Sequence, residues 1–470
     1  MVRLGTRVSE VVARHLSTLR QQPAYTTLTR VQAERLIAGP APEAGTEFEQ
    51  LVTLLEERVF AHSAREPHPG FMAYVPSCPT FPAILGDWLA TGFNSFGGVW
   101  SVAAGPNALE LTVLDWFRAW LGMPTGTGGL LTSGGSAATV TAVVAARHAA
   151  VQDEPGRLER VVLYTSTQAH SSVTRAAWIA GVPRRNVRAI PVDSGFRMIP
   201  AALESAISAD RAAGLLPFCV VASAGTTNTG SVDPLHAIAD VCRESGLWLH
   251  IDAAYGGFAA LTDRGRSLLA GIERADTVTL DPHKWLFVPF ECGCLLARDP
   301  ARLTDAFRIL PEYLRDVEND GIEVNFADYG EQLTRYTRAF KVWLPVQYFG
   351  LGAIRSAIDT GINLASHAEK LLREDPMFEI LSPAQLGIVC FRVHPRGEDR
   401  PGVLDGLNER INQQVNAAGR HFISSTRLDG RFSLRICILG FRTKQEDVDE
   451  LVASIREIAR SPVVAPIGKK

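Results

Sequence analysis

Residues 247–257 read LWLHIDAAYGG and residues 277–285 read TVTLDPHKW, and these two stretches decide the fold. Each begins as a short apolar run and ends at a carboxylate, Asp252 in the first and Asp281 in the second. A short apolar run bounded by turn residues is typical of a strand buried on both faces. We therefore expect both stretches to be strands of a covered sheet.

Runs of the same kind lie on either side of these two, separated by stretches in which apolar residues have helical spacing. The runs are GGLLTSGG (128–135), RVVLYTS (160–166), LPFCVVASAG (216–225) and CGCLLARD (292–299). The helical stretches are Ser136 to Ala150, one that begins near Ser171, and DPLHAIADVCRESG (233–246). Strands that alternate with helices predict an α/β fold with a mostly parallel sheet covered on both faces. In such sheets ligands bind at the carboxyl ends of the strands.

The segment before the α/β region has a different character. The first 65 residues are predicted to be helical, and a further helix is predicted at Asn107–Leu121. Between them, HPGFMAYVPSCPTFP (68–82) contains too much Pro, Gly and aromatic character for one regular element. It is either a linker or a loop that lines a site.

The segment after the α/β region predicts a small α+β unit. Lys341–Ala365 is a long helical pattern interrupted at Gly350–Gly352, and GIVCFRV (387–393) and GRFSLRICIL (430–439) are strand-like runs before a closing helix at Gln445–Ala459. The whole chain is therefore expected to have three parts: a helical N-terminal segment at 1–82, a large α/β domain at 83–345 and a small C-terminal domain at 346–470.

The composition excludes several classes of protein. Of the 470 residues, 46% are hydrophobic and 21% charged, which is the balance of a globular chain. Lys and Arg number 47 against 50 Asp and Glu, so no basic excess indicates nucleic acid or an anionic membrane as a partner. No window reaches 18 consecutive apolar residues, and the polar N-terminus lacks a signal-peptide pattern. Seven scattered cysteines, with Cys292 and Cys294 too close together for the usual zinc pair, predict a reduced cytoplasmic protein without a metal site.

Four chemically distinctive features fall where predicted strands end or helices begin. Lys284 and Asp252 follow strands, Gly134–Ser136 lie between a strand and a helix, and His170 precedes a helix. Each has an ordinary structural explanation when taken alone. Together they supply a lysine that can form an imine, a carboxylate that can keep a pyridine nitrogen protonated, a ring that can stack, and N–H groups that can bind phosphate. These are the requirements of pyridoxal phosphate (PLP), which accepts electrons from the α-carbon of an amino acid.

The sequence also carries a family resemblance. A resemblance over about residues 45–460 rests on strings that follow one another between residues 68 and 393: HPGFMAYVPS, LTSGGSAATVTAVVAAR, AHSSVTRAA, SAGTTNTGSVDPL, HIDAAYGG, DPHKW and LGIVCFRV. In these strings and their order the chain resembles the group II PLP-dependent decarboxylases, which include aromatic-L-amino-acid, tyrosine, tryptophan and glutamate decarboxylases. The resemblance implies the fold type I architecture and α-decarboxylation of an L-amino acid to an amine and CO2. It also implies a homodimer with active sites at the subunit interface, in which the N-terminal helices pack against the partner.

The resemblance implies roles for individual residues. Lys284 resembles the lysine that binds the cofactor as an imine, Asp252 the partner of the pyridine nitrogen, and His170 the residue stacked on the ring. Further matches are implied for the phosphate by Gly135, Ser136 and His283, for the surroundings of the ring by Thr226 and Ala254, and for the substrate pocket by Val75, Pro76 and Ser77.

Two departures from the family concern the cofactor and the substrate. Many members have Asn-Pro-His-Lys where this chain has Asp281-Pro282-His283-Lys284. A carboxylate near a phosphate repels it unless the carboxylate is turned away or hydrogen-bonded, and we interpret Asp281 as a family variant. The aromatic decarboxylases also place a Trp near the position of Glu66, which leaves an aromatic wall of the substrate pocket open to question.

A third departure concerns the product. The family has a mobile loop whose Tyr returns a proton to the α-carbon after CO2 leaves. Counted back without gaps from Lys341, that position holds Phe326, whereas a deletion of three residues would align Tyr329 instead. In the family, Phe at this point marks the aldehyde synthases, because Phe cannot donate a proton and O2 then reacts. We expect an amine as the main product, with oxidative deamination to an aldehyde as the alternative.

Two other interpretations use the same fold. Aminotransferases and cysteine desulfurases also have an Asp and a Lys, but they usually supply an Arg for the substrate carboxylate, and DPHKW disfavours them. A non-enzymatic scaffold would not need Lys284, Asp252, His170 and Ser136 together.

Overall fold

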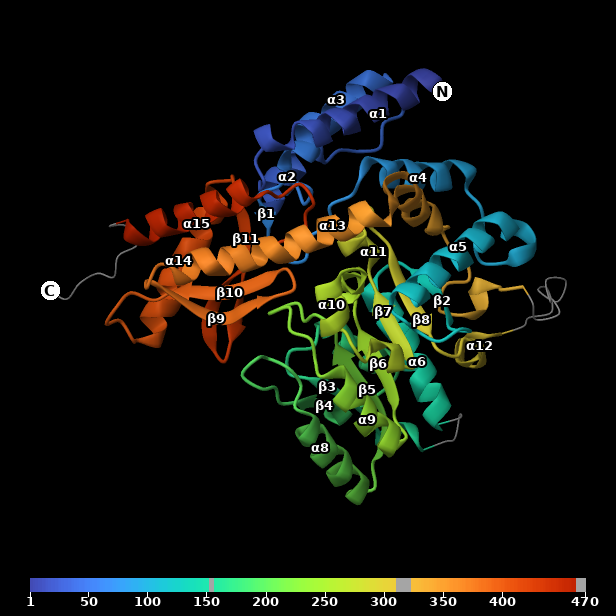
Figure 1. Ribbon diagram of the computed structural model, residues 1–470. Coiled ribbons are helices and arrows are strands. Elements are labelled where there is room, and N and C mark those ends of the chain that lie inside the picture. The colour runs from blue at the N-terminus through green and yellow to red at the C-terminus, as the bar shows by residue number, and fades with distance from the viewer. Residues whose placement is uncertain (152–155, 310–322, 462–470) are drawn as a thin grey trace. The chain divides into compact units, whose positions relative to one another are not determined.

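The computed structural model describes residues 1–151, 156–309 and 323–461 (Figure 1). The chain divides into two compact units. The smaller unit contains residues 1–78, 363–383 and 389–470, and the larger unit contains residues 79–362 and 384–388. The N-terminal helices therefore group with the C-terminal sheet. That residues 1–82 act as a dimerisation segment, in a chain of three parts, stays a prediction.

The larger unit is built on a seven-stranded sheet with the strand order β2-β8-β7-β6-β5-β3-β4. Neighbouring strands from β4 to β7 pair in parallel, whereas β8 pairs antiparallel with β7 and with β2. The predicted mostly parallel sheet is therefore confirmed. The strands are β2 (Gly128–Thr132), β3 (Val161–Ser166), β4 (Val187–Ile190), β5 (Leu216–Ser223), β6 (Trp248–Asp252), β7 (Thr277–Leu280) and β8 (Gly293–Ala297).

Helices cover both faces of this sheet, as predicted. They are α4 (Phe81–Phe93), α5 (Trp100–Trp120), α6 (Gly135–Val151), α7 (Ser171–Ile179), α8 (Pro200–Ala212), α9 (Leu235–Ser245), α10 (Asp263–Leu268), α11 (Pro282–Trp285), α12 (Ala301–Phe307) and the first part of α13 (Ala339–Arg373).

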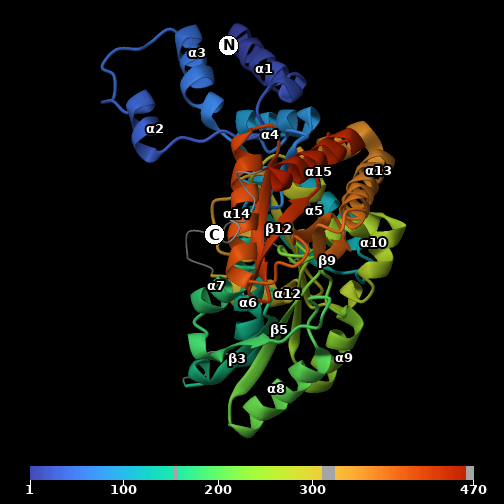
Figure 2. The same cartoon turned by 90° about the vertical axis from the view of Figure 1, so that its left-hand side faces the viewer.

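The two faces can be followed along β3, because successive side chains of a strand point to opposite sides. Leu163 belongs to a core cluster with Val143 of α6 and Val173 of α7. The next residue, Tyr164, donates its hydroxyl to Asp210 of α8, at 2.8 Å. Figure 2 shows α6 and α7 on one side of β3 and β5, and α8 and α9 on the other. With both faces covered, the strand ends are the part of the sheet that remains open to ligands.

The smaller unit combines a five-stranded sheet with helices. The sheet has the order β1-β11-β12-β10-β9, in which β1 pairs parallel with β11, and β11 pairs antiparallel with β12. Its strands are β1 (Phe71–Met72), β9 (Phe378–Gln385), β10 (Ile388–Val393), β11 (Phe422–Leu428) and β12 (Arg431–Cys437). Its helices are α1 (Val2–Ser17), α2 (Arg30–Ile37), α3 (Phe48–Arg58), α14 (Pro401–Ala417), α15 (Gln445–Arg460) and the last part of α13.

The long helix α13 is broken where the sequence predicts. Gly350 has a φ of +74°, which is outside the helical region and which glycine adopts without steric cost. Within the described residues, no helix combines the length and the apolar character needed to cross a membrane.

Candidate active site

A cavity of about 300 Å³ lies in the larger unit, at the carboxyl ends of the parallel strands. Its walls come from the segments that directly follow β2, β3, β5, β6 and β7. All eight predicted cofactor residues line it, namely Gly135, Ser136, His170, Thr226, Asp252, Ala254, His283 and Lys284. The sheet topology thus brings together residues from five separate sequence segments.

Lys284 lies in α11, a single helical turn that starts two residues after β7 ends. Its Nζ is 2.8 Å from Oδ2 of Asp281, one turn earlier. Among the described residues that line the cavity there is no other lysine. The amine is therefore held in the cavity by a carboxylate of its own segment.

His283 points its two ring nitrogens at different groups. Nδ1 is 2.6 Å from the carbonyl oxygen of Cys292 and 3.4 Å from its backbone nitrogen. The shorter contact favours a proton on Nδ1, because a carbonyl can only accept. Burial lowers the pKa of His283, although Asp281 opposes this shift. The neutral ring leaves a lone pair on Nε2, which is 3.6 Å from Oδ2 of Asp281.

Asp252 is the last residue of β6, and its Oδ1 accepts a hydrogen bond from the backbone N–H of Ala254 at 3.2 Å. The side chain is partly accessible because it lines the cavity. Burial nevertheless raises the pKa of Asp252, and the charge of Lys284 is the largest opposing cause. Because this carboxylate is costly to ionise without a cation, a cationic ligand in the cavity would stabilise it.

His170 caps the N-terminus of α7. Its Nδ1 accepts from the backbone N–H of Ser172 at 3.3 Å and lies 2.8 Å from the Ser172 hydroxyl. These two contacts fix the orientation of the imidazole and leave its ring exposed along the cavity wall.

The first turn of α6 forms a polar end of the cavity. Gly134, Gly135, Ser136 and Ala137 line it, and the first N–H groups of a helix have no acceptor within the helix. A Cβ on Gly135 would lie 3.0 Å from Oδ2 of Asp281 and 3.1 Å from the Cβ of Ala254. Glycine here keeps the helix start close to these residues and its N–H groups open to an anion.

Thr226 occupies a rigid turn. Its hydroxyl lies 2.8 Å from that of Thr229 and 2.9 Å from that of Ser231, and all three residues are buried. Gly225, with a φ of +105°, permits the turn. The hydroxyl network holds Thr226 against the cavity.

These features fit PLP. The helix start offers N–H groups to a phosphate, Asp252 offers a carboxylate to a protonated pyridine nitrogen, and Lys284 offers an amine to an aldehyde. One atom does not fit without adjustment: Oδ1 of Asp281 is buried and has no hydrogen-bond partner among the described residues.

Phe326 and Tyr329 do not line this cavity. Phe326 is fully buried, and the guanidinium of Arg335 lies 4.8 Å from the centre of its ring. Arg335 in turn forms a buried ion pair with Glu110, at 2.7 Å. Tyr329 is partly buried, and burial raises its pKa. Residues 310–322 of the same loop lie outside the described residues.

Val75, Pro76 and Ser77 belong to the smaller unit. The backbone N–H of Ser77 donates to Oε2 of Glu66 at 2.7 Å, and burial raises the pKa of Glu66. The carboxylate at the position of the family's Trp is therefore bound to the predicted substrate-pocket segment.

Sequence reasoning did not include several residues that line the cavity. They are Ser133, Ala137, Ser172, Ser223, Gly225, Thr227 and Tyr255. Each adjoins a predicted residue or lies within a quoted motif, so a rule that extends every site residue to its neighbours at the strand end would have found them.

Comparison with known proteins agrees with this geometry. A family model described as the pyridoxal-dependent decarboxylase conserved domain matches residues 31–394. The chain is 37% identical over 460 residues to the aromatic-L-amino-acid decarboxylase of Bacillus atrophaeus, and the match covers 98% of this chain and 95% of that protein.

Solved structures agree as well. The structure of Oryza sativa TDC with PLP and tryptamine matches with a TM-score of 0.93 and 29% identity over 97% of each chain. That of Rhodiola rosea 4-hydroxyphenylacetaldehyde synthase matches with a TM-score of 0.91 and 28% identity, over 98% of this chain and 99% of that one. The predicted fold type I architecture is thereby confirmed.

Proposed function

The chain belongs to the family of pyridoxal-dependent decarboxylases, and from this membership we propose how its residues act and on what. It is a PLP-dependent amino-acid decarboxylase. We propose that its substrate is an aromatic L-amino acid, because the relative from Bacillus atrophaeus is named for that activity. The product would be the corresponding amine, together with CO2.

The bound cofactor supplies an electron sink for the charge left at the α-carbon when CO2 departs. In the proposed arrangement, Lys284 would hold the cofactor through its amine, and the Asp252 carboxylate would keep a proton on the pyridine nitrogen. His170, oriented by Ser172, would cover one face of the ring. The N–H groups at the start of α6 would bind the phosphate.

The observation that carries this proposal is that all eight predicted cofactor residues line one cavity. The proposed substrate class can be tested with purified protein and a panel of L-amino acids. We expect CO2 release from tryptophan, tyrosine or phenylalanine and much less from glutamate. Activity on glutamate alone would contradict the aromatic substrate. The panel also tests the role of Glu66, whose carboxylate binds the predicted substrate-pocket segment. A carboxylate near the substrate would favour tyrosine and tryptophan, whose side chains donate a hydrogen bond, over phenylalanine.

A second candidate product is favoured by Phe326. This residue fills the gap-free position of the loop Tyr, and the aldehyde synthase from Rhodiola rosea has a closely similar fold. If the α-carbon is not protonated quickly, O2 can take two electrons from it and become hydrogen peroxide. Water then hydrolyses the oxidised product to an aldehyde and ammonia. One O2 consumed for each CO2 released would identify this chemistry.

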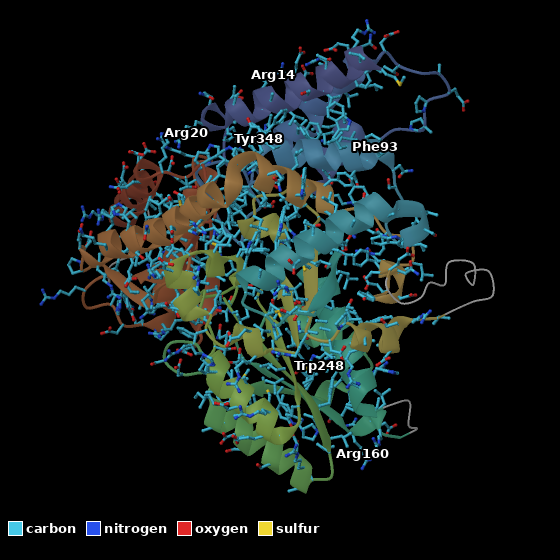
Figure 3. The ribbon with its side chains drawn as sticks, turned by 45° about the vertical axis from the view of Figure 1, so that its right-hand side comes forward. Arg14, Arg20, Phe93, Arg160, Trp248 and Tyr348 are labelled. Carbon is cyan, nitrogen blue, oxygen red and sulfur yellow. The ribbon has the colours of Figure 1, made fainter. Side chains whose placement is uncertain are left out.

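We also propose a homodimer, supported by the surface of the larger unit. Helix α4 buries its small residues Ala83, Gly86 and Ala90, whereas Trp88 and Phe93 are 47% and 78% exposed. It packs on the start of α13, since a Cβ on Gly86 would lie 2.6 Å from the carbonyl oxygen of Phe340. Further along α13 the large side chain of Tyr348 is exposed too (Figure 3), as is that of its neighbour Phe349.

Large apolar side chains that gather on the outer face of a packed helix mark an interaction surface, so we expect a second copy to cover this face. Obligate dimers bury about 2,000 to 5,000 Å².

We further propose that the protein is cytoplasmic, as the cysteine usage indicates. All seven cysteines are free thiols and buried, and unpaired cysteines are typical of a reducing compartment.

A further inference from the structure

Asp281 combines three properties that are difficult to reconcile with a bound phosphate. It is 3% exposed, it lines the proposed cofactor cavity, and its Oδ1 has no hydrogen-bond partner among the described residues. Its backbone N–H donates to the carbonyl oxygen of Ala254 at 3.2 Å, and its own carbonyl accepts from the N–H of Lys284 at 2.9 Å. Both backbone groups of Asp281 are therefore hydrogen-bonded, which fixes the position of its Cα beside the cavity.

Lys284 forms an ion pair with this carboxylate, at 2.8 Å. Lys284 and His283 face it from α11, and Asp252 lies nearby at the end of β6. Burial raises the pKa of Asp252, and the charge of Asp281 adds to this rise. Burial also raises the pKa of Cys292 and Cys294, just before β8 and on it, and Asp281 again adds to the rise. Lys284 is thus the balancing charge, and it is the residue whose amine the cofactor requires.

The carboxylate also lies at the phosphate end of the cavity. The position of a Cβ on Gly135, at the start of α6, is 3.0 Å from Oδ2 and 3.3 Å from Oδ1 of Asp281. The neighbouring Nε2 of His283 presents a lone pair, because its Nδ1 donates to Cys292. Two acceptors therefore adjoin the N–H groups that would bind the phosphate, and a phosphate oxygen is a third acceptor.

A carboxylate beside a phosphate repels it, and a proton between the two groups removes this repulsion and forms a charge-assisted hydrogen bond. We propose that Asp281 takes up one proton from solvent when the cofactor phosphate binds and donates it to a phosphate oxygen. Cofactor affinity then depends on pH in a way that an asparagine at this position does not produce. The inference rests on the proposed placement of the phosphate at the start of α6.

The test uses pyridoxamine 5′-phosphate, which has the cofactor's phosphate but no aldehyde, so that no imine formation changes the count of protons. Titration calorimetry of the cofactor-free protein at pH 8, in PIPES and in imidazole, gives the number of protons taken up from the difference between the two heats. At pH 8 the free phosphate is already doubly ionised, since its second pKa is about 6. The matched control is Asp281→Asn, which keeps the size and hydrogen-bonding geometry and removes the ionisable group.

We expect the wild type to take up about one proton more than Asp281→Asn. The wild-type dissociation constant should then rise about tenfold per pH unit above pH 7, with little change in the variant. Equal proton uptake by the two proteins would overturn the proposal and assign the proton to His283 or to the phosphate. If the wild type did not bind the probe at all, the placement of the phosphate would be wrong, and this inference with it.

A measurement on the wild type alone guards against a variant that folds poorly. Infrared difference spectra with and without the probe should show a new carboxylic-acid C=O band on binding. If the protein is made with ¹³C-labelled aspartate, this band should move to a lower wavenumber. That shift would assign the band to an aspartate. Absence of any such band would contradict protonation of Asp281.

Discussion

At the scale of single residues, Lys284 must exchange one partner for another. Its Nζ pairs with Asp281 at 2.8 Å, and the same nitrogen is the proposed attachment point of the cofactor. An amine can form an imine only after it loses its proton, so the pair with Asp281 has to be broken during loading.

Replacement of Lys284 by Ala should lower kcat/KM by at least about 1,000-fold, or about 4 kcal/mol of barrier. Lys284→Arg is the matched control, because it keeps a cation beside Asp281 but does not form an imine at neutral pH. Both variants should lose activity, and borohydride should fix the cofactor on Lys284 in the wild type only. A label on Lys341, which instead pairs with Asp87 at 2.8 Å, would refute the assignment.

The product should depend on the loop residues Phe326 and Tyr329. If the gap-free alignment holds, Phe326→Tyr should raise the ratio of amine to aldehyde, because it supplies a proton donor at the family position. Tyr329→Phe should then change the ratio little. The opposite pattern, in which Tyr329→Phe abolishes amine formation, would favour the alignment with a deletion. Amine and peroxide measured in the same reaction distinguish the two.

At the scale of elements, the pairing of β6 with β7 contains a buried histidine that ties stability to pH. His250 is fully buried, with Nδ1 2.9 Å from the Thr277 hydroxyl and Nε2 3.2 Å from that of Thr279. Burial lowers the pKa of His250 to about 3. Between this value and the usual 6.5 the unfolded chain binds a proton that the folded chain does not, so stability falls as the pH falls.

We expect His250 to account for about 2 kcal/mol of the stability lost between pH 7 and pH 5, since a pKa unit corresponds to about 1.4 kcal/mol. His250→Asn should be less stable than the wild type at pH 7, but its free energy of unfolding should fall less steeply towards pH 5. Urea unfolding at both pH values and one protein concentration measures the two slopes. If the free energy of unfolding of both proteins falls equally between pH 7 and pH 5, groups other than His250 cause the loss of stability.

The elements that sequence reasoning missed have identifiable physical causes. The run Gly293–Ala297 predicts a buried strand. A short apolar run carries no information on the direction of the strand within the sheet, so the antiparallel pairing of β8 could not be predicted. Helix α4 was missed because large residues on one of its faces and small residues on the other do not form the usual apolar stripe. The break of α13 at Gly350 was predictable, since glycine alone marks it.

The candidate site was easier to predict than the helices around it. Lys284, Asp252 and His170 lie at strand ends or helix starts, and in a parallel sheet these positions converge on one edge. The partner of each side chain was not predictable. That the Asp281 carboxylate turns toward Lys284 depends on a side-chain rotamer and not on a sequence pattern.

At the scale of the whole molecule, the exposed face of α4 should decide the state of assembly. Light scattering should give a dimer of 51.0 kDa chains at micromolar concentration. Phe93→Glu should weaken this dimer by about 2 kcal/mol or more, because it places a charge in an apolar interface. Ile179→Glu is the control, since Ile179 is also exposed, at 62%, but lies on α7. A wild-type monomer, or equal effects of the two variants, would contradict an interface on α4.

The exposed aromatic residues of α4 also affect the newly synthesised chain, before two copies have formed a dimer. A newly synthesised chain that has folded its sheet still presents Trp88 and Phe93 to the crowded cell, where any other exposed apolar surface competes with the correct partner. Dimerisation and aggregation then compete for the same exposed surface. Dimerisation requires one specific orientation of the two copies, whereas aggregation does not. Rapid overproduction should therefore increase the insoluble fraction. Slow synthesis at low temperature with chaperones present should increase the yield of active enzyme.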